Sequence, residues 1–196
     1  EIGTDPAVIR EFAQTADEAG FDFLGVFDHL IGAHPDRFAG NLPGYERPPY
    51  IHENAFHEVF TLLAYFAAVT TRIELETAVL VLPQRQTALV AKQAAEVAIL
   101  SGDRLQLGVG LGWNFTEYEG LNEDFHTRGR RVEEQIAVLR KLWTEPLVTF
   151  EGRWHHYDRI GIYPRPARQI PIWMGGGTSD RLLQRTARFA DGWMPN

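Results

Sequence analysis

Hydrophobic and polar positions along this chain alternate between short apolar runs and longer segments with helical spacing. The runs that predict buried strands lie at 23–27, 72–81, 105–110 and 170–174, and a further strand begins near 191. The segments that predict helices lie at 6–20, 56–69, 86–100, 128–143 and 180–190. A small hairpin is expected at 147–157, with its turn at Glu151-Gly152.

Two of these helices carry clear local signals. Asp5 and Pro6 are typical of an N-cap and a first helical turn, and Gly20 suits the end of that helix. Its apolar face is predicted to be Val8, Phe12, Ala13 and Ala16. The helix at 128–143 places one apolar stripe along its length, made of Val132, Ile136, Leu139 and Trp143.

Strands that alternate with helices predict a parallel sheet with right-handed crossovers. Two architectures have this pattern, a doubly wound sheet and a TIM barrel. The chain shows five sheet strands, whereas a complete barrel has eight in roughly 250 residues. The pattern alone leaves both architectures open.

Composition narrows the class of protein. The 196 residues are 44% hydrophobic and 23% charged, as expected for one globular domain. A net charge of -7 without any block of like charges disfavours nonspecific binding to nucleic acid or anionic membranes. The absence of cysteine excludes disulfides and thiolate chemistry. Neither a signal peptide nor a membrane-spanning run is recognisable, so a soluble cytoplasmic protein is expected.

In parallel α/β folds, ligands gather at the carboxyl ends of the strands. The loops there begin at Asp28, Thr77, Gly108 and Gly175. Asp28 and His29 form the best acid/base pair, because a neutral imidazole takes a proton near pH 7 and a neighbouring carboxylate can orient it. The alternative is that both residues only cap the loop that follows.

Two glycine clusters invite a cofactor interpretation. "GVGLGWN" at 108–114 has the spacing G-x-G-x-G and not G-x-G-x-x-G, so a dinucleotide site is disfavoured against close backbone packing or approach to a flat ring. "GGGTSD" at 175–180 has the glycines, the hydroxyls and the helix N-terminus that bind anions. A glycine-rich turn with a Thr or Ser N-cap explains it equally well.

Other polar residues predict less. His52 and His57 are poorly spaced for one helical face, and no three or four ligands converge in the sequence, so no metal site is expected. Arg128, Arg130 and Arg131 are interpreted as the solvated start of a helix, with at most a minor role in steering an anionic cofactor.

A resemblance covers nearly the whole chain. The stretches that carry it are "FLGVFDHL", "TAVLVLPQRQ", "SGDRLQLGVGLGWN", "DFHTRGRRVEEQIAVLRKLWTEP", "FEGRWHHY", "PRPARQIPIWMGGGTSD" and "ADGWMPN". In this order they resemble the luciferase-like flavin-utilising superfamily, and more closely its branch of oxidoreductases that use coenzyme F420, a deazaflavin. Each motif alone is weak, and the ordered set is specific.

The resemblance implies a (β/α)8 TIM barrel of the bacterial-luciferase type. It also implies that residues 1–196 form one domain with about five to six βα units and a small hairpin, in which the first strand and the last βα units are missing. It further implies a bound flavin or deazaflavin, with the ring held against the strand ends and the tail phosphate held by later loops. A homodimer is expected, since dimers are common in the family.

Carried over residue by residue, His29 with Asp28 matches the catalytic position near the reactive ring carbon. Thr77 and Ala78 match a strand-end bulge behind the ring, often with a non-prolyl cis peptide bond. The further cofactor-binding matches are Gly110, Gly112, Trp113 and Asn114 beside the ring, and Gly176, Gly177 and Thr178 at the phosphate.

The expected activity is hydride transfer between coenzyme F420 and a small organic substrate, with Tyr45, Arg47 and Tyr50 of the loop at 31–54 helping to shape the substrate pocket. Sugar-phosphate dehydrogenases of this family carry a glutamate where this chain has Trp113, so a sugar phosphate is a poor substrate. The alternatives are an FMN-dependent monooxygenase that uses reduced flavin and oxygen, and a cofactor-binding protein without catalytic activity.

Overall fold

The computed structural model describes residues 2–39 and 47–195. Its helices are α1 (Pro6–Glu18), α2 (Val59–Val69), α3 (Thr87–Ser101), α4 (Phe115–Gly120), α5 (Arg128–Thr144) and α6 (Asp180–Phe189). Its strands are β1 (Phe23–Val26), β2 (Glu74–Val81), β3 (Leu105–Gly110), β4 (Val148–Glu151), β5 (His156–Ile160), β6 (Ile172–Gly176) and β7 (Gly192–Pro195). Short 3-10 turns are η1 (Pro35–Phe38), η2 (Leu82–Gln84) and η3 (Phe125–Thr127).

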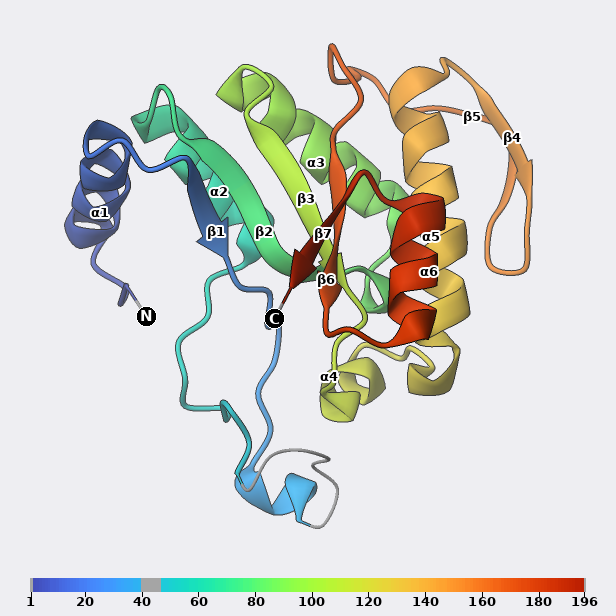
Figure 1. The fold of residues 1–196 in the computed structure, drawn as a ribbon, viewed down its shortest axis with the longest axis horizontal. Coiled ribbons are helices and arrows are strands. Elements are labelled where there is room, and N and C mark those ends of the chain that lie inside the picture. Colours follow the sequence, from blue (N-terminus) through green and yellow to red (C-terminus); the bar gives the residue numbers. More distant parts are fainter. Residues whose placement is uncertain (1, 40–46, 196) are drawn as a thin grey trace.

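The sheet has five strands in the order β1-β2-β3-β6-β7, and every neighbouring pair is parallel. The hairpin β4-β5 forms a separate antiparallel sheet that lies beyond α5 (Figure 1). The alternation of strands and helices and the parallel sheet are therefore confirmed. The short helix α4 is an addition, because none of the predicted helices covers 115–120.

Side-chain caps fix where the helices begin. The Asp5 carboxylate accepts the Ala7 N–H at 2.8 Å, as predicted for the first helix. The second helix begins at Val59 and not near residue 56, because the Glu58 carboxylate accepts the N–H and the hydroxyl of Thr61. The predicted apolar face of α1 is partly wrong. Ile9 and Ala13 are the buried residues of α1, whereas Val8 and Phe12 are 49% and 46% exposed.

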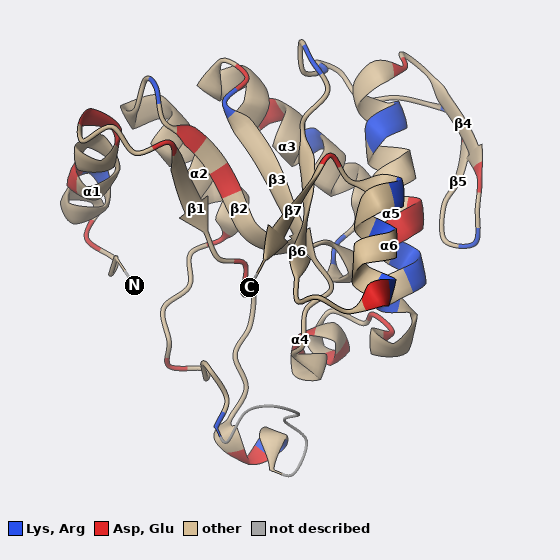
Figure 2. Ribbon diagram, in the orientation of Figure 1, with Lys and Arg blue, Asp and Glu red and all other residues tan. Residues whose placement is uncertain are grey.

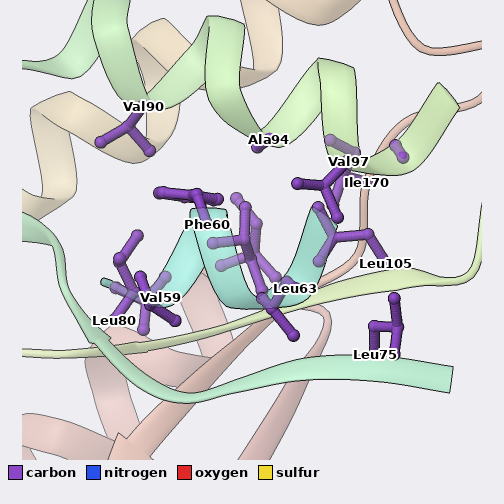
Figure 3. Packing of buried hydrophobic residues seen from close by; sticks show 14 of the residues in the cluster. Val59, Phe60, Leu63, Leu75, Leu80, Val90, Ala94, Val97, Leu105 and Ile170 are labelled. Atoms are coloured by element: carbon purple, nitrogen blue, oxygen red, sulfur yellow. The ribbon is translucent and has the colours of Figure 1, made fainter. Parts of the chain in front are cut away.

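The main core lies between one face of the sheet and the helices α2, α3 and α5. Figure 3 shows Val59, Phe60 and Leu63 of α2 facing the strands and α3. The predicted stripe of α5 is confirmed, because Val132, Ile136, Leu139 and Trp143 are all at most 2% exposed. Burial of these large side chains is the main stabilising contribution to the fold.

The opposite face of the sheet is not covered by these helices (Figure 1). It carries Phe23, which is 46% exposed, and Glu76, whose carboxylate accepts a hydrogen bond from Gln106 at 2.6 Å. In a (β/α)8 barrel this face lines the interior, while the other face packs against the helical ring. Within the described ranges, no helix is both long enough and apolar enough to cross a membrane.

Candidate functional site

The carboxyl ends of β1, β2, β3 and β6 meet at one edge of the sheet, because all four strands run in the same direction (Figure 1). Asp28 and His29 follow β1, Gly112 follows β3, and the glycine turn at 175–177 ends β6. This edge therefore collects the residues that the sequence predicted to be functional.

Asp28 forms a buried ion pair. Its side chain is fully buried, and its two oxygens accept Arg85 Nη2 at 2.6 Å and Arg85 Nε at 3.1 Å. The Val81 N–H donates to the same carboxylate at 2.9 Å. Burial alone would lower the pKa of Arg85, but the carboxylates of Asp28 and Glu58 raise it overall. The Asp28 carboxylate thus holds the end of β1 against the end of β2. Its hydrogen bonds go to Arg85 and Val81 and do not orient His29.

His29 is oriented by a different carboxylate. Its Nδ1 lies 3.3 Å from Oε1 of Glu117, a residue of α4 that is only 1% exposed. The Leu30 N–H donates to the same oxygen at 3.2 Å. The imidazole ring also lies against the rings of Tyr50 and Phe56, with centroid distances of 3.8 Å and 4.8 Å. We call His29, Tyr50, Asn114 and Glu117 the histidine cluster.

Asn114 ties the rest of the histidine cluster together. As the N-cap of α4, its Oδ1 accepts the Thr116 N–H at 3.0 Å, and its Nδ2 donates to the Tyr50 hydroxyl at 2.5 Å. Burial raises the pKa of Tyr50 above its ordinary value, and the charge of Glu117 raises it further. Tyr50 therefore stays a neutral phenol at physiological pH, and its hydroxyl shares a hydrogen bond without carrying charge.

The end of β2 is irregular where the sequence predicted a bulge. The register with β3 shifts between Thr77 and Leu80, and a non-prolyl cis peptide bond joins Ala78 to Val79. The side chain of Val79 fills the space between two glycines. A Cβ added at Gly110 or at Gly175 would lie 2.3 Å from a methyl carbon of Val79. Both glycines are therefore required for close packing, and for Gly110 this was one of the interpretations of "GVGLGWN".

A cavity of about 680 Å³ opens beside this bulge. The loop after β3, the turn after β6 and the N-terminal parts of α5 and α6 surround it. Its lining residues are Val79, Gly110, Leu111, Gly112, Trp113, His126, Arg128, Gly129, Arg130, Gly175, Gly176, Ser179, Arg181, Leu182 and Arg185. Figure 2 shows many basic residues on α5 and α6, whereas β2 carries acidic ones. We call this space the arginine cavity.

The four arginines of the cavity differ in their partners. Arg185 is paired with Glu133 at 2.9 Å, and Arg128 lies over the Phe125 ring at 3.6 Å. The Nε of Arg128 is buried and has no hydrogen-bond partner in the described part of the chain. Over residues 2–39 and 47–195, Arg130 and Arg181 make neither an ion pair nor a hydrogen bond. The cavity therefore holds positive charge that the protein does not neutralise.

The predicted cofactor-binding residues divide into groups. Gly110, Gly112, Trp113 and Gly176 line the arginine cavity, and Asn114 belongs to the histidine cluster. Thr77 and Ala78 form the bulge next to Val79, and the buried Thr77 hydroxyl donates to the Gly108 carbonyl at 2.7 Å. Gly177 and Thr178 are exposed and do not line the cavity, and Ser179 is the N-cap of α6.

Several residues of the site were not predicted from the sequence. Arg128, Arg130 and Arg131 were interpreted as a solvated helix start. Arg130 is exposed as expected, whereas Arg128 and Arg131 are partly buried, and Arg128 and Arg130 line the cavity. Arg181 is the second residue of α6 and was not predicted to be a site residue. Glu117 could have been noticed from the pattern Asn-x-x-Glu at 114–117, which is typical of a helix N-terminus.

The predicted pocket loop is only partly described. Tyr50 lies in the histidine cluster and Arg47 is exposed, whereas Tyr45 lies outside the described residues. A second cavity, of about 750 Å³, is lined by aromatic and acidic residues of α4 and η3, and Trp113 borders both cavities. No group of three or more histidine, aspartate or glutamate side chains suited to a metal ion occurs within the described ranges.

A parallel sheet with helices packed on one face and a cavity at its carboxyl edge is the arrangement found in part of a TIM barrel. The model of the luciferase-like monooxygenase family matches residues 2–196, and the chain belongs to this family. The fold also matches a solved F420-dependent secondary alcohol dehydrogenase, with a TM-score of 0.77 and 22% identity over 96% of this chain and 53% of that one.

Relatives of known activity share less sequence identity with this chain than an uncharacterized relative does. An uncharacterized protein of Mycobacterium tuberculosis is 36% identical over 99% of this chain and 67% of its own length. An F420-dependent glucose-6-phosphate dehydrogenase of Mycolicibacterium gilvum is 32% identical over 96% of this chain and 53% of its length. The pyrimidine monooxygenase RutA of Allorhizobium ampelinum is also 32% identical, over 96% and 50%. The chain thus spans about half the length of these two enzymes.

Proposed function

We propose that this protein is an oxidoreductase that moves a hydride between coenzyme F420 and a small organic substrate. The observation that carries the proposal is the arginine cavity, which joins the bulge of β2 to the N-terminus of α6. The sequence relatives include F420-dependent dehydrogenases, and the fold matches an F420-dependent alcohol dehydrogenase.

The residues present fit a cofactor with an anionic tail. Arg130 and Arg181 have no protein partner among the described residues, and Arg128 has a buried Nε without one. The backbone of α6 begins at the same place, and a helix N-terminus favours negative charge. An anion there would satisfy donors that the protein leaves open, and charge-assisted hydrogen bonds are the stronger kind.

The other end of the cavity fits a flat ring. Val79 and Trp113 offer apolar surface next to the bulge, and Gly110 packs against the Val79 side chain. We assign the ring to these residues and the tail to the arginines. When bound, the cofactor supplies the hydride chemistry, and the protein supplies orientation and control of protons.

His29 is the proposed general acid or base toward the substrate. It is partly accessible, with a side-chain exposure of 18%, whereas Asp28 and Glu117 are buried. Asp28 enters the proposal as the anchor that holds this strand end through Arg85. Trp113 stands where sugar-phosphate dehydrogenases of the family carry a glutamate, so we expect a substrate other than a sugar phosphate.

A titration of the full-length protein with coenzyme F420 and with FMN, followed by absorbance and fluorescence, tests this proposal. We expect binding of coenzyme F420 by the natural protein and by the variant His29→Ala, with turnover by the variant slower by about 100-fold or more. Absence of binding to either cofactor would refute the proposal. Unchanged turnover by His29→Ala would remove the proposed role of His29.

A second candidate is an FMN-dependent monooxygenase, which the similarity to the pyrimidine monooxygenase favours. The arginine cavity suits a phosphate of FMN as well as the tail of coenzyme F420. Oxygen consumption coupled to substrate oxidation separates the two activities. Tight cofactor binding without turnover over a broad substrate panel would instead indicate a binding protein.

A further inference from the structure

Glu117 is a buried carboxylate with an unusual pair of partners. Its Oε1 receives the Leu30 N–H at 3.2 Å and lies 3.3 Å from His29 Nδ1, although these residues are far from it in sequence. A buried carboxylate must be compensated by hydrogen bonds or opposite charge. Both partners come from the loop after β1, so Glu117 connects α4 to the proposed acid/base residue.

The local sequence explains why this contact is not a by-product of helix capping. Asn114 is the N-cap of α4, so Glu117 stands at the third helical position, where a glutamate commonly turns back to the N-cap N–H. Asn114 does cap the helix, but its Oδ1 accepts the N–H of the second helical residue, Thr116, at 3.0 Å. The Glu117 carboxylate turns instead toward His29 and Leu30.

The contact fixes which nitrogen of His29 carries the proton in the neutral ring. An ionised carboxylate accepts hydrogen bonds and donates none, so Nδ1 must be the donor. Nε2 is then the unprotonated nitrogen that is free to take a proton. Tyr50 and Phe56 pack against the ring and limit its rotation.

Among the described residues, the other titratable groups beside His29 have different contacts, although Tyr50 also interacts with the Glu117 carboxylate. Asp28 is the nearest carboxylate in sequence, but its oxygens accept hydrogen bonds from Arg85 and Val81. Tyr50 faces the ring as a neutral phenol, and its hydroxyl accepts a hydrogen bond from Asn114 at 2.5 Å.

We propose that Glu117 is a positioning residue that holds His29 in the Nδ1–H tautomer and so presents Nε2 to the reacting proton. The consequence for catalysis rests on the proposed function, whereas the effect on the tautomer does not. Glu117 has no direct contact with substrate in this proposal.

The test is nitrogen-15 NMR of the histidine side chains in the full-length protein without cofactor, near pH 8.5, where imidazoles are generally neutral. The signals of His29 are assigned by their loss in His29→Asn. We expect the natural protein to show the Nδ1–H tautomer of His29. The Nε2–H tautomer in the natural protein would overturn the proposal, whatever the variants do.

Two variants at position 117 and one control sharpen the result. Glu117→Met removes the acceptor, so the His29 signals should move toward the tautomer mixture of a free imidazole. Glu117→Gln keeps an amide oxygen and should preserve the Nδ1–H form. Glu119→Met, on the same helix but 62% exposed and paired with Arg37, should leave His29 unchanged. An unchanged tautomer in a folded Glu117→Met protein would show that Glu117 only supports the loop.

Turnover provides the second measurement. With substrate and cofactor in hand, Glu117→Met should lower kcat by about 10-fold to 100-fold, as for other residues that orient a functional histidine. Glu117→Gln should recover part of this loss, and cofactor affinity should change by less than about twofold in either variant. A changed tautomer in a protein that shows no turnover on any substrate would support the role of Glu117 and refute only the proposed activity.

Discussion

Charged side chains near β1 and charged side chains on α5 and α6 differ in whether they have ion-pair partners. On the β1 side, every charged group of the Asp28–Arg85–Glu58 set has a partner within 3.3 Å, and Asp28 and Arg85 are at most 9% exposed. On the α5 and α6 side, Arg130 and Arg181 line a cavity and have no partner among the described residues. The charges of the first set are compensated within the protein, whereas the two arginines of the second set could still pair with an anion.

This difference predicts that the paired residues contribute to stability, whereas the unpaired arginines contribute to binding. A buried pair stabilises the fold only while both members are present, because either one alone is a buried charge without compensation. A cation at a cavity wall stays hydrated and costs the fold little, so its removal should affect binding and not stability. The predictions below test this separation.

The largest effect is expected at the buried pair. Asp28→Ala leaves Arg85 with only Glu58, at 3.3 Å, and should lower the free energy of unfolding by about 3–5 kcal/mol. Chemical denaturation measures this loss. Lys92→Ala, which breaks the exposed pair with Glu96, is the matched control and should cost about 0–1 kcal/mol. Similar values for both variants would contradict the assignment of Asp28 as an anchor.

A smaller loss of stability is expected from crowding the side chain of Val79, at the bulge of β2. Gly110→Ala would place a methyl group 2.3 Å from a carbon of Val79 and should destabilise the protein by about 1–3 kcal/mol. Gly177→Ala is the control, because its added Cβ has no neighbour within 4 Å. Adding Val79→Ala to Gly110→Ala should restore part of the stability. A double variant no more stable than Gly110→Ala alone would show that packing against Val79 is not the cause.

At the arginine cavity the effect should appear in affinity. Arg181→Ala should weaken cofactor binding about tenfold, which corresponds to about 1.4 kcal/mol, and leave the free energy of unfolding within about 0.5 kcal/mol. Fluorescence titration and denaturation measure the two quantities. Arg10→Ala, on α1, is the control and should bind the cofactor normally. Normal binding by both Arg181→Ala and Arg130→Ala would place the anion elsewhere.

The smallest effect concerns a satisfied charge away from the site. Burial alone would raise the pKa of Glu134, but hydrogen bonds from His155 and from the N–H groups of 153–155 lower it below 4.5 overall. A lowered carboxyl pKa stabilises the fold above the unfolded pKa, and this stabilisation is lost as the pH falls through the folded pKa. The difference in stability between the natural protein and Glu134→Gln should therefore shrink below about pH 4.5. A difference independent of pH would contradict this.

Local signals in the sequence were enough for most of the fold. The Asp5 cap and the apolar stripe of α5 could be predicted because both depend on residues close together in the sequence. The alternation of strands and helices predicted the parallel sheet. The face of α1 was mispredicted because Ile9 and Phe12 are both apolar, and only packing against α2 decides which is buried.

The site itself depends on contacts between distant segments. The partner of Asp28 is Arg85, and the partner of His29 is Glu117, and neither pairing leaves a trace in local spacing. The helix α4 has six residues, which is too short to show apolar periodicity. The hydrophobic pattern therefore does not place Glu117 on a helix. The arginines of α5 and α6 face one cavity because the two helices lie in consecutive connections, from β3 to β6 and from β6 to β7.

The order of strands also has a consequence for how the chain folds. β2 pairs with β3 across a single helix, and β6 pairs with β7 in the same way, so each pair can form as a local unit. β3 and β6 are joined only after α4, α5 and the hairpin have been placed, since Leu107 pairs with Ile172. Closing this longer loop costs somewhat more conformational entropy than closing either local pair. The arginine cavity lies across this junction, so it is complete only once β3 and β6 have paired.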